Sequence, residues 1–299
     1  MTAKTTSPIL PHWVAHALLA IAPLCWAANL VLAKGVVDLL PPIAFAFWRW
    51  VLAFLLLLPF AWRHARRDWA TAVAGWKSIS VLAMTGIAGF PSMLYAAVHT
   101  TTAINGSLIQ TTMPGFIILL SMAIFGEKVS ARQLVGAATC VLGAATVVLK
   151  GDLVAMSIPD FAHGDILMTL AVILYAIYSL LLGHRPSVHP LSLMVYTFAL
   201  GALGLFPLYL WELSELGGFT VCREIVLSIV FVALFPSIVA YFCWNRGIDV
   251  IGPNRGGLYI CLIPVFASIL AISFIGETLK TYHIAGMIMI VTGMAIFRR

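Results

Sequence analysis

"MPGFIILLSMAIFGE" at residues 113–127 and "IPVFASILAISFIGE" at residues 263–277 are two versions of one stretch. Each has a proline as its second residue, then a long apolar run and a closing Gly-Glu pair, and the two copies lie 150 residues apart. The same offset relates Gly143 to Gly293 further along the chain. This repetition indicates that the chain contains two copies of one structural unit.

A second pair of matches extends the repeat towards its beginning. The tripeptide "FPS" occurs at residues 90–92 and again at residues 235–237, at an offset of 145 residues. The two copies therefore correspond over most of their length, with a small difference in one connection. We predict two halves, residues 1–150 and residues 151–299, each of which is a five-helix repeat.

The composition places this repeat in a membrane. Of 299 residues, 62% are hydrophobic and 9% are charged, whereas soluble domains are about 45–50% apolar and about 25% charged. A helix needs about 20 apolar residues to cross a hydrocarbon core of about 30 Å. Ten apolar runs approach this length: residues 13–33, 41–60, 78–97, 104–125, 131–149, 165–183, 190–210, 225–245, 256–275 and 281–297.

Five spans per half is an odd number, so the second half begins on the opposite side of the membrane from the first. We therefore predict an all-α membrane protein with ten transmembrane helices, arranged as two five-helix inverted-topology repeats. Inverted repeats are typical of secondary transporters, in which the substrate binds near the middle of the membrane between the halves.

The distribution of basic residues predicts the orientation. With both termini in the cytoplasm, 12 of the 17 Lys and Arg residues fall on the cytoplasmic side and 4 on the other, while Arg49 lies within a span. Cytoplasmic loops of membrane proteins are enriched in Lys and Arg. We expect a multi-pass protein of the inner membrane with cytoplasmic N- and C-termini.

Several motifs in this order resemble the EamA-type members of the drug/metabolite transporter superfamily. They are "CWAANLVLAK" at 25–34, "FWRWVLA" at 47–53, the Gly-Glu pairs that close the fourth and ninth spans, and "GDILMTLAVILYAIYSLL" at 164–181. The resemblance implies that spans one to four and six to nine line a central cavity, and that spans five and ten are peripheral. Members of this family move amino acids, other metabolites or drugs, so the resemblance favours export but leaves the substrate open. We predict export of amino acids, and export of drugs is the alternative.

Polar and aromatic side chains near the middle of the spans are the candidates for this cavity. Trp26 and Asn29 lie three residues apart on one helical face, as do Tyr175 and Tyr178 at the equivalent place in the second half. In hydrocarbon such groups must face a cavity or another helix. The alternatives are hydrogen bonds between helices and, for Trp and Tyr, a place in the interfacial aromatic belt. The predicted substrate-binding residues are Trp26, Asn29, Arg49, Tyr95, His99, Gln110, Tyr175, Tyr178, Tyr241, Trp244 and Asn245.

Arg49 is the charged residue within a span. It follows Pro41 by eight residues, which places it about 12 Å into the second span. An arginine near the middle of a membrane costs about 2.5–3.5 kcal/mol on insertion scales, so it needs a reason to be there. One hypothesis is that it binds a substrate carboxylate through its forked guanidinium. The other is that it binds backbone carbonyls at a broken helix and fixes the second span.

Glu127 and Glu277 close the fourth and ninth spans just before the next helix begins. A carboxylate there can accept hydrogen bonds from the free N–H groups of the following helix and stabilise its positive end. We assign both a structural role.

Several classes of site are not indicated. Five cysteines have no paired spacing, and His12 and His16, four residues apart, have no third ligand with matching spacing, so we predict no metal site and no cofactor. The sequence has no nucleotide-binding motif and no nucleophile–base pair at depth. A membrane-embedded enzyme and a non-transporting scaffold are therefore weaker alternatives to a transporter that is secondary or facilitative.

The predicted partners are a small-molecule substrate and the lipid bilayer, without nucleic acid, for a monomer or a weak homodimer. No acidic residue falls in the middle of a span, so a carboxylate relay for protons is not expected. His99 is the one titrating alternative.

The orientation can be tested with single cysteines in a variant whose five native cysteines are replaced. A cysteine at Gly151 should react with a membrane-impermeant thiol reagent added from outside, and one at Arg66 should not. Labelling of Arg66→Cys but not of Gly151→Cys in intact cells would refute the assignment.

Overall fold

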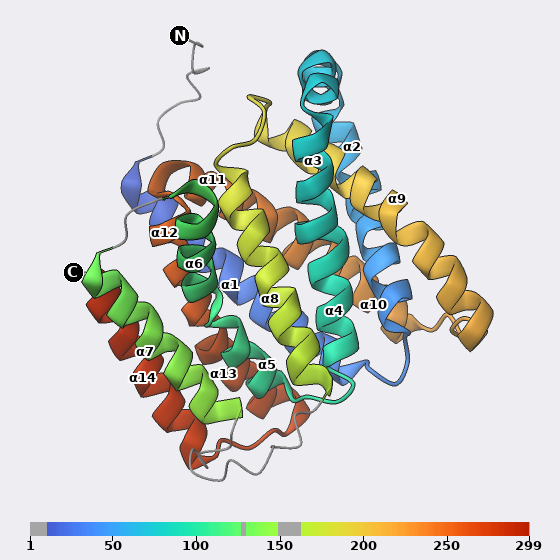
Figure 1. Ribbon diagram of the computed structural model, residues 1–299. Helices are drawn as coiled ribbons and strands as arrows, with labels where there is room; N and C mark the ends of the chain where they lie inside the picture. The colour runs from blue at the N-terminus through green and yellow to red at the C-terminus, as the bar shows by residue number, and fades with distance from the viewer. Residues whose placement is uncertain (1–10, 127–129, 149–162, 299) are drawn as a thin grey trace.

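The computed structural model describes residues 11–126, 130–148 and 163–298, and these residues are almost entirely helical (Figure 1). The predicted all-α fold is confirmed. The first half contains α1 (His12–Gly35), α2 (Pro42–Ala74), α3 (Trp76–Leu82), the π-helix η1 (Ala83–Gly89), α4 (Phe90–Ala97), α5 (Ala103–Gln110), α6 (Met113–Phe125) and α7 (Ala131–Val148).

The second half has a similar order of elements, with a short α-helix and a 3₁₀ helix in the place of α5. It contains α8 (His163–Leu182), α9 (Pro190–Leu216), α10 (Arg223–Val232), the π-helix η2 (Ala233–Val239), α11 (Ala240–Ile251), α12 (Pro253–Gly256), the 3₁₀ helix η3 (Gly257–Leu262), α13 (Ile263–Ile275) and α14 (Thr281–Arg298). A π-helix thus interrupts the third helical stretch of each half.

Seven helical stretches within the described residues are long and apolar enough to cross a membrane. They are 12–35, 42–74, 76–97, 103–125, 163–182, 190–216 and 223–251. Two shorter apolar stretches, Tyr259–Ile275 and Thr281–Gly293, follow. The prediction of a membrane protein with several spans is supported, and the count of ten stays a prediction.

The apolar runs predict a connection at residues 61–77, between the second and third spans, and this prediction is wrong in one respect. Residues 61–74 continue α2 as a helix, and only Gly75 separates it from α3. The arginines of this segment mark the end of the apolar run, but arginine is a good helix former. The apolar run therefore ends before the helix does.

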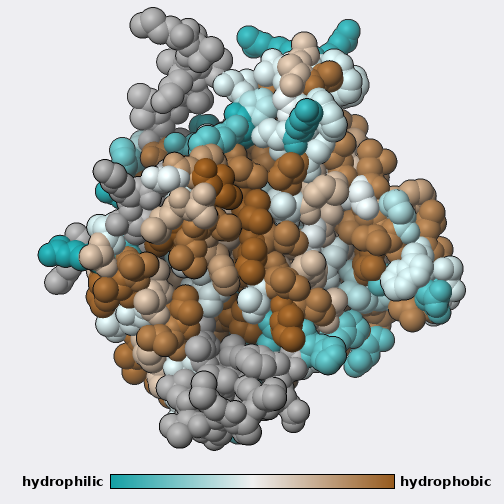
Figure 2. Space-filling model, in the orientation of Figure 1, coloured by the Kyte–Doolittle hydropathy of each residue, from teal (hydrophilic) through white to brown (hydrophobic). Residues whose placement is uncertain are grey.

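The surface agrees with a bilayer environment. On the face shown in Figure 2, hydrophobic residues cover the middle of the molecule, and hydrophilic ones gather towards its ends, including the α2–α3 tip. Leu55, Phe60, Leu203 and Phe274 are exposed by 55%, 80%, 66% and 78%. Apolar side chains this exposed on so many helices suit contact with lipid better than contact with water.

The interior is built from contacts between the halves. α2 packs against α9, α1 against α11 and α13, and α4 against α8. Each of these contacts joins a helix of residues 12–148 to a helix of residues 163–298. The interior therefore lies where helices of the two halves meet.

α7 and α14 form a separate pair at one edge of the molecule, side by side in Figure 1. Glycines bring the two backbones together. A Cβ atom on Gly143 would lie 2.8 Å from the carbonyl oxygen of Gly286, and one on Gly293 would lie 2.6 Å from the carbonyl oxygen of Gly136. Small residues allow such close approach between membrane helices, which explains the paired glycines of the sequence repeat.

Two buried or partly buried carboxylates fix the starts of helices in the opposite half. The Glu212 carboxylate, from α9, accepts hydrogen bonds from the backbone N–H groups of Ile43 (3.0 Å) and Ala44 (2.6 Å) at the start of α2. Glu277 accepts from Ala103 (2.9 Å) and Ile104 (3.1 Å) at the start of α5. Both satisfy N–H groups that a helix cannot pair internally.

The structural role predicted for Glu277 is thus observed at a different helix. The carboxylate caps α5 rather than α14, the helix that follows it in sequence. Gly276 has a left-handed backbone (φ 68°) where α13 ends, and the chain beyond it brings Glu277 to α5. Glu127 lies outside the described residues.

Because α7 and α14 are so close, one added methyl group at Gly293 should destabilise the protein. Gly293→Ala should lower the free energy of unfolding by about 1–3 kcal/mol, because the new Cβ meets backbone that cannot move aside. A thermal melt of the protein in detergent would measure this as a lower midpoint.

Gly35→Ala is the matched control. A Cβ there meets only Ile275, at an ordinary 3.5 Å, and alanine favours the helix by up to about 1 kcal/mol relative to glycine. Equal midpoints for the two variants would contradict the packing described for α7 and α14.

Candidate functional site

Arg49 lies inside the protein, on α2, with 2% of its surface exposed. Its Nε donates to the Ser237 hydroxyl (2.6 Å), its Nη1 to the Tyr95 hydroxyl (2.8 Å) and its Nη2 to the Pro236 carbonyl (3.0 Å). The guanidinium therefore connects α2 to α4 within the first half and to η2 in the second half.

The π-helix η2 supplies two of these partners. Pro236 has no N–H to give to the preceding turn, and the Val232 carbonyl instead accepts from the Ser237 hydroxyl (2.6 Å). The Pro236 carbonyl accepts from the Trp26 indole (3.1 Å) as well as from Arg49. Irregular turns of this kind free backbone acceptors, which is one reason why they occur often at functional sites.

Tyr95 extends the network to α1. Its hydroxyl accepts from Arg49 and donates to the Asn29 side-chain oxygen at 2.8 Å. All three side chains are buried, with 2% of each exposed. One hydrogen-bonded chain therefore runs through α1, α4, α2 and η2, and its members fix one another's orientation.

The charge of Arg49 is not neutralised by a carboxylate. Within the described part of the chain, the one ion pair joins Arg185 and Asp249 at 2.7 Å, and both of these side chains are partly exposed. Around Arg49 the contacts are hydroxyls, a carbonyl and the ring faces of Trp50 and Tyr95, at 4.6 and 5.9 Å from the guanidinium carbon. Buried charges are normally paired, so this site is suited to an anion.

An aromatic cluster surrounds the network on the side of the second half. The ring of Trp26 lies 5.4 Å from Tyr175, 6.1 Å from Tyr241 and 5.2 Å from Trp244, all edge-on. Tyr241 also contacts Trp50, at 5.3 Å, and donates a hydrogen bond to the Gly86 carbonyl of η1. Edge-on pairs of this kind contribute specific geometry as well as apolar burial.

One Tyr–Asn hydrogen bond of the site occurs in each half, with the residue types exchanged. Tyr95 donates to Asn29 between α4 and α1, and Tyr178 donates to Asn245 between α8 and α11, at 3.0 Å. Positions 29 and 178 differ by 149 residues, and positions 95 and 245 by 150. The second half therefore repeats the contact by presenting the tyrosine where the first half presents the asparagine.

Nine of the predicted site residues lie together in this buried network and cluster. They are Trp26, Asn29, Arg49, Tyr95, Tyr175, Tyr178, Tyr241, Trp244 and Asn245. Trp244 and Asn245 are 0% and 2% exposed, which places them in the interior and not in an interfacial belt.

The other two predicted residues lie apart. His99 is exposed, in the turn that follows α4. Gln110 is buried but donates only a long bond (3.4 Å) to the Gly106 carbonyl of its own helix. Neither contacts Arg49. The spacing of four residues placed Tyr95 and His99 on one face, but α4 ends at Ala97, so His99 falls at the edge.

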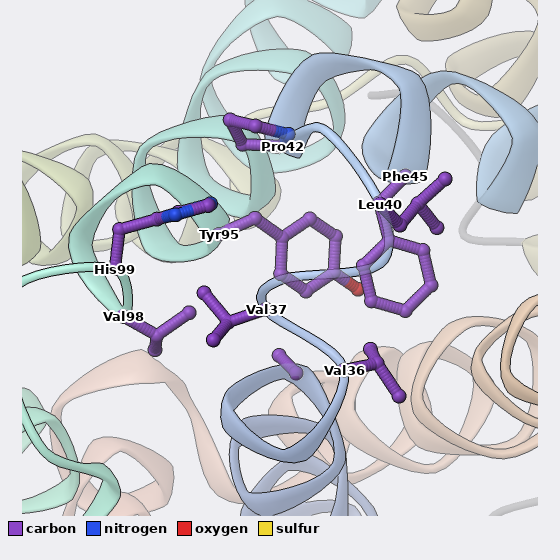
Figure 3. A pocket seen from close by; sticks show the side chains of 9 residues that line it. Val36, Val37, Leu40, Pro42, Phe45, Tyr95, Val98 and His99 are labelled. Carbon is purple, nitrogen blue, oxygen red and sulfur yellow. The ribbon is translucent and has the colours of Figure 1, made fainter. Parts of the chain in front are cut away.

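A small hollow lies between the end of α1, the start of α2 and the end of α4 (Figure 3). Its wall is mostly apolar, with Tyr95 and His99 as its polar members. The residues that line it are Ala33, Val36, Val37, Leu40, Pro42, Phe45, Tyr95, Val98 and His99. Its volume of about 10 Å³ is about what one water molecule needs. It reaches the site at Tyr95, and the site itself is closed in this structure.

Several groups that contact Arg49 or cap its helix were not identified from the sequence. Ser237 and Pro236 bind Arg49, Trp50 packs on it, and Glu212 caps the helix that carries it. The recurrence of "FPS" was a signal for the first two, but it did not indicate a partner for the arginine. Within the described residues, no three His, Cys, Asp or Glu side chains are grouped as a metal site would require.

Comparison with known proteins gives one family. The sequence profile described as "EamA-like transporter family" matches residues 13–149 and again residues 162–299. The chain is 30% identical over 287 residues to an uncharacterized transporter of Archaeoglobus fulgidus, covering 93% of this chain and 95% of the relative. It is 24% identical over 286 residues to a probable amino-acid metabolite efflux pump of Salmonella typhimurium, covering 91% and 90%.

A solved crystal structure has a similar fold. It superposes with a TM-score of 0.70 at 19% identity, over 95% of this chain and 99% of the other. At this identity the likeness concerns the fold alone. It agrees with the arrangement of helices described above.

Removing the Ser237 hydroxyl should destabilise the protein, because this group accepts a hydrogen bond from Arg49. Ser237→Ala leaves the charged Arg49 Nε without its partner, and should cost about 1.5–3 kcal/mol. Chemical denaturation in detergent would measure the change.

Ser107→Ala is the matched control, since Ser107 is also fully buried but donates only to the Ile104 carbonyl of its own helix. We expect its effect to be the smaller by at least 1 kcal/mol. If the two variants unfold alike, the Ser237 hydroxyl does not hold Arg49.

Proposed function

Because the chain belongs to the EamA-like transporter family, we propose that it is a secondary or facilitative transporter of small polar metabolites that carry a carboxylate. The proposed activity is export of amino acids across the inner membrane by alternating access, with both termini in the cytoplasm. The protein is then not an enzyme, and its partners are its substrate and the bilayer.

The unneutralised guanidinium of Arg49 is the observation that carries this proposal. Three of its five N–H donors have protein partners, which leaves donors for a ligand. The described residues supply dipoles but no negative charge to this buried cation. A substrate carboxylate would bring the missing charge, and the forked geometry of the guanidinium suits it.

Alternating access is supported by the repetition within the fold. In each half a π-helix interrupts the third helical stretch, and each half makes one of the matched Tyr–Asn bonds. In the inverted topology that we predict, two similar halves can exchange conformations, and this opens the site between them to each side in turn. Arg49 connects the halves at η2, so a carboxylate bound to its guanidinium would lie at a contact between them.

The hollow at Tyr95 supports a route to the site from one end. In the proposed orientation this end faces away from the cytoplasm, because α1 begins inside and ends beside the hollow. Its wall is apolar apart from Tyr95 and His99, which suits a metabolite with an apolar side chain. A small change at Tyr95 would connect the hollow to Arg49.

The choice of amino acids rests on a relative as well as on Arg49. The Salmonella relative is a probable amino-acid metabolite efflux pump, and an amino acid carries a carboxylate that can pair with the guanidinium of Arg49. The alternative is export of drugs or other toxic compounds, which the aromatic interior would also suit. Lipophilic cations are disfavoured, because they would meet the charge of Arg49 with no carboxylate nearby.

Transport by purified protein in liposomes tests the proposal. Efflux of labelled phenylalanine and leucine should exceed that of phenethylamine and isoamylamine, which have the same side chains but no carboxylate. Arg49→Lys should fold and yet reduce amino-acid transport about tenfold or more, since a single ammonium does not replace the fork.

Arg66→Lys, at an exposed arginine of the same helix, is the control and should transport normally. Normal amino-acid transport by a well-folded Arg49→Lys variant would rule out Arg49 as the carboxylate site. Faster transport of the amines would favour the drug-export alternative.

A further inference from the structure

Four polar groups in and beside the aromatic cluster are buried without a hydrogen-bond partner among the described residues. They are the indole nitrogens of Trp50 and Trp244 and the hydroxyls of Tyr175 and Ser179. Tyr175 is 1% exposed and the other three residues are 0% exposed. Buried polar groups in folded proteins nearly always have a partner, so four in one region call for an explanation.

These groups come from helices of both halves that meet at one set of rings. Trp50 is on α2, Tyr175 and Ser179 on α8 and Trp244 on α11. The ring of Tyr241 lies 5.3 Å from Trp50 and 6.0 Å from Tyr175, and Tyr175 lies 6.2 Å from Trp244. Ser179 follows Tyr175 by one helical turn. The four unpartnered groups therefore lie on this set of rings or one turn from it, and the set begins at Arg49 because Trp50 packs on it.

The chemistry of these groups restricts what could satisfy them. An indole N–H can only donate, and a hydroxyl can donate or accept. The Tyr178 hydroxyl donates to Asn245 and that of Tyr241 to Gly86, so these two neighbouring tyrosines are already committed as donors. The end of a ligand that satisfied this region would have to present hydrogen-bond acceptors and carry no positive charge.

We propose that Trp50, Tyr175, Ser179 and Trp244 form a donor subsite for the uncharged end of the substrate. This subsite selects carboxylates whose other end carries a neutral acceptor, such as a carbonyl, amide or hydroxyl oxygen, on a flat or apolar body. The inference rests on the proposed function, because it takes the carboxylate end to lie at Arg49. The subsite then determines which carboxylates the protein prefers to transport.

A structural explanation for the unpartnered indoles exists and must be separated from this one. Trp244 meets Trp26 edge-on at 5.2 Å and 61°, and Trp50 meets Tyr241 at 86°. An N–H group directed at a ring face gains a weak bond. Such a role would affect the stability of the protein but not its choice between two substrates.

Matched pairs of amino acids separate the two explanations. Tyrosine and phenylalanine differ by one oxygen, and glutamine and norleucine compare a side-chain amide with an apolar chain of similar length. We expect the wild-type protein in liposomes to transport tyrosine and glutamine with the higher kcat/KM of each pair. Trp244→Phe and Ser179→Ala should each reduce this preference about three- to tenfold, the worth of one neutral hydrogen bond.

Trp69→Phe, at a tryptophan that is 63% exposed, is the control and should leave both ratios as they are. Ser179→Ala removes only one oxygen, so it gives a result even if Trp244→Phe does not fold. Transport of all four amino acids without preference, or an unchanged preference in folded variants, would overturn the donor subsite and leave the proposed function intact. Transport of none of the four would overturn both.

Discussion

A buried guanidinium with only neutral partners is the constraint on which the rest of this structure depends. Arg49 lies in the interior of a chain whose helices suit a membrane, and its contacts are two hydroxyls, one carbonyl and two ring faces. Each contact requires a local feature elsewhere. The carbonyl comes from a proline in a π-helix, and the start of the helix that carries Arg49 is fixed by the Glu212 carboxylate. These features are explained together if the site has to keep a positive charge available at depth.

The charge of Arg49 has no counterpart at the equivalent position of the second half, although the fold otherwise repeats itself. The Tyr–Asn bond occurs in both halves, and so do the π-helix and the glycine contacts of α7 and α14. The position equivalent to Arg49 is Phe198, whose ring packs on Trp50 at 4.7 Å. A symmetric frame permits exchange between two orientations of the halves, while one unpaired charge gives the substrate a defined end. In the proposed mechanism, the symmetry serves the exchange of conformations and the charge serves the binding of the substrate.

The sequence was sufficient for features that depend on local pattern. Apolar runs predicted where helices lie, and polar residues at helical spacing predicted nine of the residues that are buried together. Features that depend on distant contacts were not accessible. Pro236 and Ser237 lie 187 and 188 residues from Arg49 in sequence, and nothing in the spacing of "FPS" indicates which side chain it meets. Glu277 was expected to cap its neighbour and caps α5, and His99 lies outside the network because α4 ends two residues earlier.

The most direct test of Arg49 as the carboxylate site is a distance measured in the membrane. Solid-state NMR dipolar recoupling can measure the separation between the ¹³C-labelled carboxylate of a bound amino acid and ¹⁵N-labelled arginine side chains in lipid bilayers. A bidentate or single hydrogen bond to Arg49 would place the carboxylate carbon within about 4 Å of a guanidinium nitrogen, and the signal should vanish when Arg49 is replaced by lysine. A bound amino acid whose carboxylate shows no coupling to any arginine nitrogen would contradict the account.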